Sequence, residues 1–105
     1  MDDILVRIKR AVLAGRYAFS EKARLEMIAD GLTELDVAES ILNARSIHKR
    51  IRSRSPSRLP AREYLYVIRG RNFSGLTIYT KGRLEKDVDQ DMFYFLISSK
   101  RSVQG

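Results

Sequence analysis

The spacing of apolar residues changes near residue 45, and this change limits the fold more than any other feature of the sequence. Before it, apolar residues recur every three or four positions, as in "ILVRIKRAVL" and "LDVAESILN". This spacing predicts amphipathic helices over residues 3–14, 21–30 and 34–44. Ser20 is placed to cap the second helix, and "TELD" is typical of the capping box that opens a third.

After residue 45 the apolar residues alternate with polar ones or form short runs rich in β-formers. This pattern predicts strands over residues 63–70, 76–84 and 92–100. "SIHKRIR" would add an edge strand, and "RYAF" reads as a short extended link. We therefore predict one α+β domain over residues 1–105, with three N-terminal helices packed on one face of a three- to four-stranded antiparallel sheet.

Positive charge is concentrated in residues 48–62, "HKRIRSRSPSRLPAR", which hold six basic residues and no acidic one. The whole chain has 20 basic and 13 acidic residues and a net charge of +7, so the rest is nearly neutral. Prolines and serines predict a basic loop over residues 53–62. Such a concentration attracts polyanions, chiefly nucleic acid, although a loop that only aids solubility has the same composition.

Several classes of site and location are disfavoured by the sequence. There is one histidine and no cysteine, and the alternating aspartates of "DVDQD" lack the glycine and closing glutamate of an EF-hand loop. No phosphate-binding glycine motif is present, so we expect no metal and no cofactor. No apolar run approaches the roughly 20 residues of a membrane span, and "MDDILVRIKR" is not a secretory signal. We expect no membrane partner and a cytoplasmic location.

Metal-free cleavage of RNA remains compatible with the residues present. The 2′-OH of RNA can attack the adjacent phosphorus, provided that the protein supplies a proton acceptor, cations and a proton donor. The candidate catalytic residues are His48, Lys49, Tyr64, Lys81 and Lys100. The candidate nucleic-acid-binding residues are Arg50, Arg52, Arg54, Arg58, Arg62 and Tyr66. Each has a plainer interpretation, since a lone histidine is often a surface residue and strand tyrosines often pack in a core.

The order of these segments resembles that of a known family. "IKRAVLAGRYAFSEKARLEMIADGLTELDVAESILNARSIHKRI" followed by "EYLYVI" is similar to the MqsR-type toxins, small metal-independent ribonucleases of the wider RelE-like group. The resemblance implies a RelE/MqsR-like fold, cleavage of mRNA and inhibition by a cognate antitoxin protein. It places the family's lysine after the third helix at Lys49 and its strand tyrosine at Tyr64. Its late lysine falls on Lys81 or Lys100.

The chain also resembles uncharacterised small bacterial domains that open with a Ser-x-His-Ala-x-x-Arg-Met pattern, here "SEKARLEM". Lys22 stands where histidine is usual, and Glu26 where arginine is usual. If those positions serve catalysis, both substitutions would weaken it. The segment before Tyr64 is also shorter and richer in arginine than in MqsR-like proteins.

Three functions fit these features. The first is the toxin component of a toxin–antitoxin-like system, a metal-independent endoribonuclease acting on mRNA. The second is a non-catalytic nucleic-acid-binding or regulatory module that uses residues 48–62 for affinity alone. The third is a protein-interaction domain whose basic loop meets an acidic partner. Salt-dependent binding of RNA without cleavage would favour the second.

Overall fold

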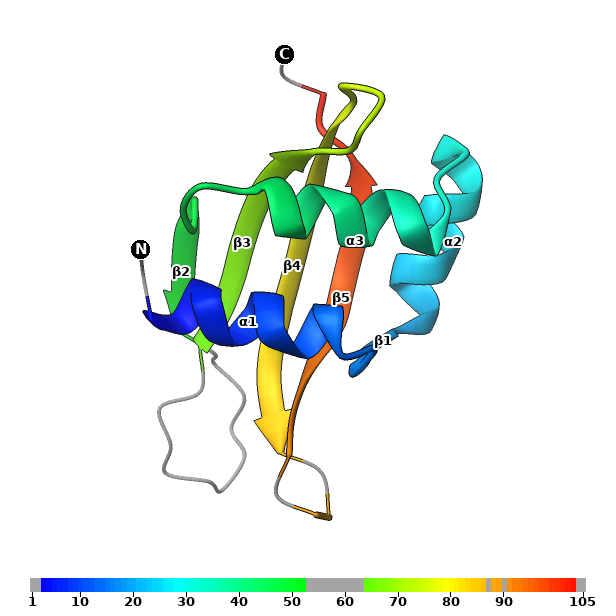
Figure 1. The fold of residues 1–105 in the computed structure, drawn as a ribbon. Coiled ribbons are helices and arrows are strands. Elements are labelled where there is room, and N and C mark those ends of the chain that lie inside the picture. The colour runs from blue at the N-terminus through cyan, green and yellow to red at the C-terminus, as the bar shows by residue number, and fades with distance from the viewer. Residues whose placement is uncertain (1–2, 53–63, 87, 90, 104–105) are drawn as a thin grey trace.

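The computed structural model describes residues 3–52, 64–86, 88–89 and 91–103. Within these ranges the five strands form one sheet in the order β1-β5-β4-β3-β2, with β1 parallel to β5 and the other neighbours antiparallel. Figure 1 shows α1 and α3 lying across one face of the sheet, with α2 beside its β1–β5 end. In chain order the elements are α1 (Asp3–Leu13), β1 (Tyr17–Phe19), α2 (Glu21–Asp30), α3 (Glu34–Asn43), β2 (Lys49–Arg52), β3 (Tyr64–Arg71), β4 (Thr77–Lys86) and β5 (Met92–Arg101).

The prediction of a three- to four-stranded antiparallel sheet with all helices before it was wrong. The sheet is mixed and has five strands, because "YAF" forms β1 between α1 and α2 and β2 adds the opposite edge. In β1, Tyr17 lies beside Tyr94 and Phe19 beside Leu96. A parallel partner covers part of the outer edge of β5, whose backbone N–H and C=O groups would otherwise lack strand partners.

The caps predicted from the sequence form as expected at α2 and α3. The Ser20 side chain accepts a hydrogen bond from the Ala23 N–H at 3.0 Å. At α3, the Thr33 side chain accepts from the Asp36 N–H, and the Asp36 carboxylate accepts from the Thr33 N–H. Along the described chain, no helix has both the length and the apolar character needed to cross a bilayer.

The core lies between the helices and one face of the sheet. Its fully buried sheet residues include Ile68 on β3, Ile78 on β4 and Tyr94 on β5. Burial raises the pKa of Tyr94, as does the neighbouring Tyr66, so the Tyr94 hydroxyl stays neutral. Because side chains alternate along a strand, the odd-numbered residues of β3 and β4 point to the other face. Among the described residues no helix lies across that face, although α2 flanks it along β5, and we call it the open face of the sheet.

Two glycines permit close contacts within this core. A Cβ atom built on Gly70 would lie 1.9 Å from the carbonyl oxygen of Ser40, so the backbone of α3 rests directly on β3. A Cβ atom on Gly82 would lie 2.7 Å from both the Tyr94 ring and the carbonyl oxygen of Phe95. Both distances are shorter than real Cβ contacts, so any larger residue at these positions requires the neighbouring backbone or ring to move.

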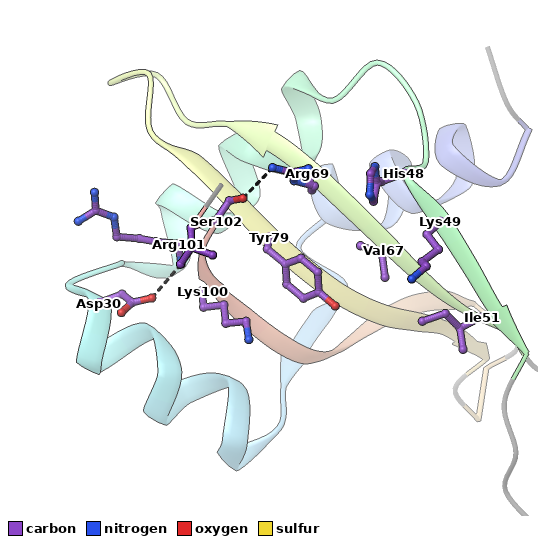
Figure 2. A pocket seen from close by; sticks show the side chains of 11 residues that line it. Asp30, His48, Lys49, Ile51, Val67, Arg69, Tyr79, Lys100, Arg101 and Ser102 are labelled. Carbon is purple, nitrogen blue, oxygen red and sulfur yellow. Dashed lines mark hydrogen bonds between the residues drawn. The ribbon is translucent and has the colours of Figure 1, made fainter. Parts of the chain in front are cut away.

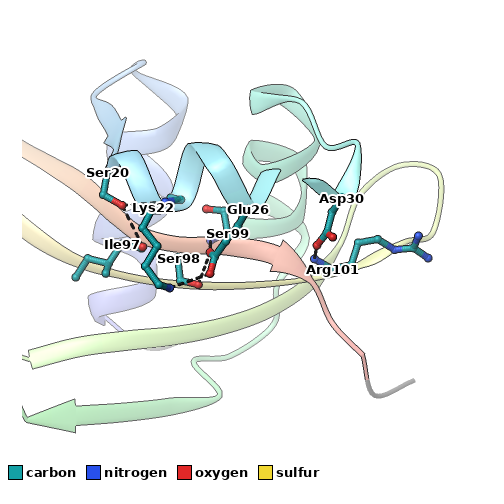
Figure 3. Close-up of polar contacts among 9 residues, drawn as sticks. Ser20, Lys22, Glu26, Asp30, Ile97, Ser98, Ser99 and Arg101 are labelled. Atoms are coloured by element: carbon teal, nitrogen blue, oxygen red, sulfur yellow. Dashed lines mark hydrogen bonds and ion pairs between the residues drawn. The ribbon is translucent and has the colours of Figure 1, made fainter. Parts of the chain in front are cut away.

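Beyond β1, side chains of α2 continue to cover the edge of β5 (Figure 3). The Glu26 carboxylate accepts hydrogen bonds from the Ser99 N–H at 3.0 Å and the Ser98 hydroxyl at 2.7 Å. Asp30, one turn later, accepts from the Arg101 N–H at 2.8 Å. Four residues of helix rise about 6 Å and two residues of strand about 6.7 Å, so the two carboxylates match alternate N–H groups of β5.

Acid is expected to weaken this contact. Burial raises the pKa of Glu26, but hydrogen bonds from Lys22, Ser98 and the Ser99 N–H outweigh it and place the pKa below its ordinary value of 4.5. A carboxylate with a lowered folded-state pKa stabilises the fold above its unfolded pKa, and this stability is lost as pH falls through the folded value. We expect the free energy of unfolding to fall with pH below about 4.5 in urea titrations.

The variant Glu26→Gln tests whether the Glu26 carboxylate causes this dependence on pH, since glutamine keeps an acceptor oxygen but carries no charge. At pH 7 it should lower the free energy of unfolding by about 1 kcal/mol, and the difference from wild type should shrink as the solution is acidified. Glu21→Gln, at an exposed position of the same helix, serves as the control. A gap between wild type and Glu26→Gln that stays constant down to low pH would contradict the assignment.

Candidate nucleic-acid interface on the open face of the sheet

The open face carries a pocket of about 570 Å³ near the C-terminal end of β5. Figure 2 shows its side chains, which come from β2 and the residue before it, from β3 and β4, from β5 and the residues after it, and from the end of α2. The lining residues are Asp30, His48, Lys49, Ile51, Val67, Arg69, Tyr79, Lys100, Arg101, Ser102 and Val103. Lys49, Arg69, Lys100 and His48 line the pocket, whereas the Arg101 side chain extends away from them in Figure 2. Its three cations and one imidazole suit an anion.

Strand register explains why residues so distant in sequence meet here. Directly paired residues point to the same face of a sheet. One row across the sheet runs from Lys49 through Val67 and Lys81 to Ser98. The next row contains Arg69, Tyr79 and Lys100. The two rows together place cations from β2, β3 and β5 around a tyrosine on β4.

The floor of the pocket is apolar. Val67 is 2% exposed although it lies on the open face, and the half-buried Ile51 lies diagonally across from it on the neighbouring strand. A charge held over an apolar floor is less well screened by water than one on an open surface, so its attraction for a phosphate is stronger. The floor also offers an apolar surface for a base or ribose.

The tyrosine of the pocket is held by its neighbours. The Lys100 ammonium lies 5.4 Å from the centre of the Tyr79 ring, within the range of a cation–π contact. In Figure 2, Tyr79 lies between Lys100 and Lys49, with its hydroxyl directed toward the β2 side. Arg69 donates a hydrogen bond to the Ser102 hydroxyl at 2.9 Å, which fixes its guanidinium at the rim.

The one acidic residue of the lining is already engaged. The Asp30 carboxylate accepts a hydrogen bond from the Arg101 backbone N–H at 2.8 Å, as part of the contact between α2 and β5. Its carboxylate therefore offsets only part of the positive charge that the lysines and arginines bring to the pocket. The balance of charge at the pocket favours a ligand with more than one negative group.

Three of the five predicted catalytic residues line this pocket, namely His48, Lys49 and Lys100. His48 precedes β2, where its backbone N–H donates to the Val67 carbonyl at 2.8 Å. Lys81 lies on the same face, paired with Val67 and Ser98, but does not line the pocket. Of the two lysines between which the sequence left the choice open, Lys100 lines the same pocket as Lys49, whereas Lys81 lies two strands from Lys49 in the same row.

Tyr64 is not brought to Lys49. It pairs with Arg52, and the alternation along β2 and β3 directs both side chains to the face opposite Lys49. Its ring centre lies 6.4 Å from that of Tyr66, which is only 7% exposed and belongs to the core. Stacking of a base on Tyr66 would therefore require its ring to leave the core.

The predicted binding arginines fall into two groups. Arg50 and Arg52 are exposed on β2, and the Arg50 guanidinium lies 5.8 Å from the centre of the Tyr66 ring. They share the face of Tyr64, on the opposite side of the sheet from the pocket. The predicted basic loop, residues 53–62, lies outside the described residues. It includes Arg54, Arg58 and Arg62.

Sequence reasoning missed Tyr79 and Arg69, which the structure places at the centre and rim of the pocket. Both could have been found from the alternation of polar and apolar residues along their strands. In "LTIYTKGRL" the odd positions carry Tyr79, Lys81 and Arg83, while the even positions are apolar or small. An aromatic and basic stripe facing away from the core is typical of sheets that bind single-stranded nucleic acid. The stripe continues to Phe95, whose ring lies 5.2 Å from the Arg83 guanidinium.

Lys22 and Glu26, the two departures from the bacterial-domain pattern, lie on α2 beside β5. They form an ion pair of 2.8 Å, and Glu26 binds Ser98 and Ser99 as described above. Neither lines the pocket. In this structure both residues belong to the contact between α2 and β5.

The chemistry available in the pocket is that of cations, a phenol and an imidazole. Among the residues that the structure describes, no group of three or more histidine, cysteine or acidic side chains could hold a metal ion. Positive side chains over an apolar floor, with two groups able to exchange a proton, fit a phosphodiester better than a neutral ligand. No protein-family model, curated protein or solved structure matches this chain, so the likeness to the MqsR-type toxins rests on the sequence pattern alone.

Proposed function

We propose that the protein is a metal-independent endoribonuclease that holds single-stranded RNA on the open face of its sheet. The observation that carries the proposal is the meeting of Lys49, Tyr79 and Lys100, from three strands, in one pocket rimmed by His48 and Arg69. Cations alone would support binding. The addition of a phenol and an imidazole supplies the proton transfers that cleavage requires.

The chemistry follows from the 2′-OH of the RNA. Its oxygen attacks the adjacent phosphorus while its proton passes to an acceptor, and the bond from phosphorus to the 5′-oxygen breaks as that oxygen gains a proton. The products are a 2′,3′-cyclic phosphate and a 5′-hydroxyl. His48 and Tyr79 supply the acceptor and the donor. Lys49, Lys100 and Arg69 stabilise the extra negative charge on the phosphorane.

A toxin–antitoxin role is the biological setting that we propose for this activity, with mRNA in the bacterial cytoplasm as substrate and a cognate antitoxin protein as inhibitor. Its support is the resemblance of the segment order and of Lys49 to the MqsR-type toxins. The lysines and the arginine of the pocket lie on the open face of the sheet, so an inhibitor protein that covers this face would block the access of RNA to them.

Cleavage should be independent of metal and should require the 2′-OH. Purified protein incubated with single-stranded RNA in excess EDTA is expected to give fragments ending in a 2′,3′-cyclic phosphate, detected by mass spectrometry. An RNA with a single 2′-deoxy nucleotide at the cleaved position should bind with unchanged affinity and resist cleavage there, because the nucleophile is absent.

Two results would overturn the proposal. One is cleavage of the deoxy-substituted strand at the same bond, which would show that the 2′-oxygen is not the nucleophile. The other is binding of RNA with no cleavage of any sequence, which would leave a nucleic-acid-binding module. Toxicity on expression, relieved by Lys49→Ala, would support the toxin role separately.

A further inference from the structure

A second pocket, of about 580 Å³, lies where the loop after α3 passes the edge of β3. Its lining residues are Asn43, Ala44, Arg45, Ser46, Arg69, Gly70 and Arg71. Arg69 also lines the pocket on the open face, so the two pockets meet at this side chain. The two pockets are therefore neighbours on the surface.

The lining of the second pocket contains three arginines and no acidic residue. Arg45 and Arg71 are exposed, so their guanidinium groups can turn toward a ligand. A fourth cation stands behind the loop, where the half-buried Lys9 of α1 donates a hydrogen bond to the Ala44 carbonyl at 2.6 Å. The charged side chains that line this pocket are therefore all positive, which suits a polyanion. The nearby carboxylates of Asp36 and Glu39 accept hydrogen bonds from the Asn72 side chain and the Phe73 N–H.

One edge of β3 contributes backbone to the second pocket. The described part of β2 pairs with β3 only as far as Val67. On this edge the later residues of β3 face the loop, while their other edge pairs with β4. Asn43 donates a side-chain hydrogen bond to the Arg71 carbonyl at 2.8 Å, which shows that this edge of β3 points toward the end of α3. The loop that follows α3 therefore runs beside this edge of β3.

We propose that this second pocket binds a phosphate of the RNA strand next to the one held in the first pocket. The proposal rests on the proposed function, since it assigns the flanking part of the same substrate. Arg45 and Arg71 would contact the flanking phosphate, and Arg69 would lie between the two phosphates. The site would then favour strands of several nucleotides over a dinucleotide, which has a single phosphodiester.

The double variant Arg45→Ala/Arg71→Ala tests this assignment with two probes, a dinucleotide and a single-stranded hexanucleotide. It should bind the dinucleotide as wild type does and the hexanucleotide about tenfold more weakly, as expected for two lost charge-assisted contacts. The slope of log affinity against log salt should flatten by about 0.7 for the hexanucleotide, the value for one phosphate that is no longer neutralised.

Arg7→Ala/Arg10→Ala removes the same charge from α1, away from both pockets, and serves as the control. Arg45→Lys/Arg71→Lys should restore the salt slope if charge is what matters. An unchanged hexanucleotide affinity in the alanine variant, or an equal loss in the α1 variant, would overturn the subsite. A wild-type protein that binds neither probe would instead refute the proposed function.

Discussion

Replacing Gly70 with alanine is expected to lower the free energy of unfolding by about 3 kcal/mol or more. The new Cβ atom would lie 1.9 Å from the carbonyl oxygen of Ser40 and 2.9 Å from its carbon, both of which belong to the backbone of α3. A backbone cannot turn aside as a side chain can, so the whole helix must move. Val37 and Ile41, which are fully buried on α3, would lose packing against the sheet.

Urea unfolding followed by circular dichroism measures this loss, and the midpoint of thermal unfolding should fall by roughly 12 °C or more. Gly75→Ala is the matched control, because Gly75 has a φ of 88° and nothing within 4 Å of a built Cβ. Its cost is backbone strain alone, about 1 kcal/mol. If Gly70→Ala costs no more than Gly75→Ala, α3 does not rest on β3 as closely as described.

The helices were predictable because their signals are local. The predicted ranges 3–14, 21–30 and 34–44 lie within one residue of α1, α2 and α3. Each boundary depends on residues a few positions apart, such as Ser20 with Ala23. Gly31 ends α2 in the left-handed conformation, which glycine adopts without strain.

The sheet was only partly predictable because its pairings are not local. β1 is three residues long, too short for a clear alternation, and its partner Tyr94 lies 77 positions after Tyr17. Nothing within "RYAF" indicates that partner. Its formation depends on the outer edge of β5, a feature that exists only once the rest of the sheet has assembled.

The pocket shows the same limit for a functional site. Alternation within one strand shows which of its residues share a face. It does not show which residues of the neighbouring strand lie on that same face, because this depends on the register between the strands. Lys49 and Tyr64 therefore looked compatible from the sequence, whereas the register pairs Lys49 with Val67 and Tyr64 with Arg52. The same register brings Tyr79, on a strand not adjacent to β2, to the pocket of Lys49.

This geometry makes a distinct catalytic prediction. Lys49→Ala and Lys100→Ala are each expected to reduce the rate of RNA cleavage about a hundredfold, or roughly 3 kcal/mol, because each removes a cation that stabilises charge growing in the transition state. Tyr79→Phe keeps the ring under Lys100 and removes only the hydroxyl, so it should also slow cleavage strongly while the fold is retained. Single-turnover cleavage of a defined RNA, with circular dichroism to check folding, provides the measurement.

Two comparisons within the same sheet make the test specific. Tyr64→Phe changes an exposed tyrosine on the opposite face, and Lys81→Ala removes a lysine from the open face but outside the pocket. Both should slow cleavage far less than their counterparts Tyr79→Phe and Lys100→Ala, since a transition-state contact depends on direct approach to the phosphate. The opposite order, with Tyr64 essential and Tyr79 dispensable, would place the reaction on the helix side of the sheet. It would also remove the pocket of Lys49, Tyr79 and Lys100 from the mechanism.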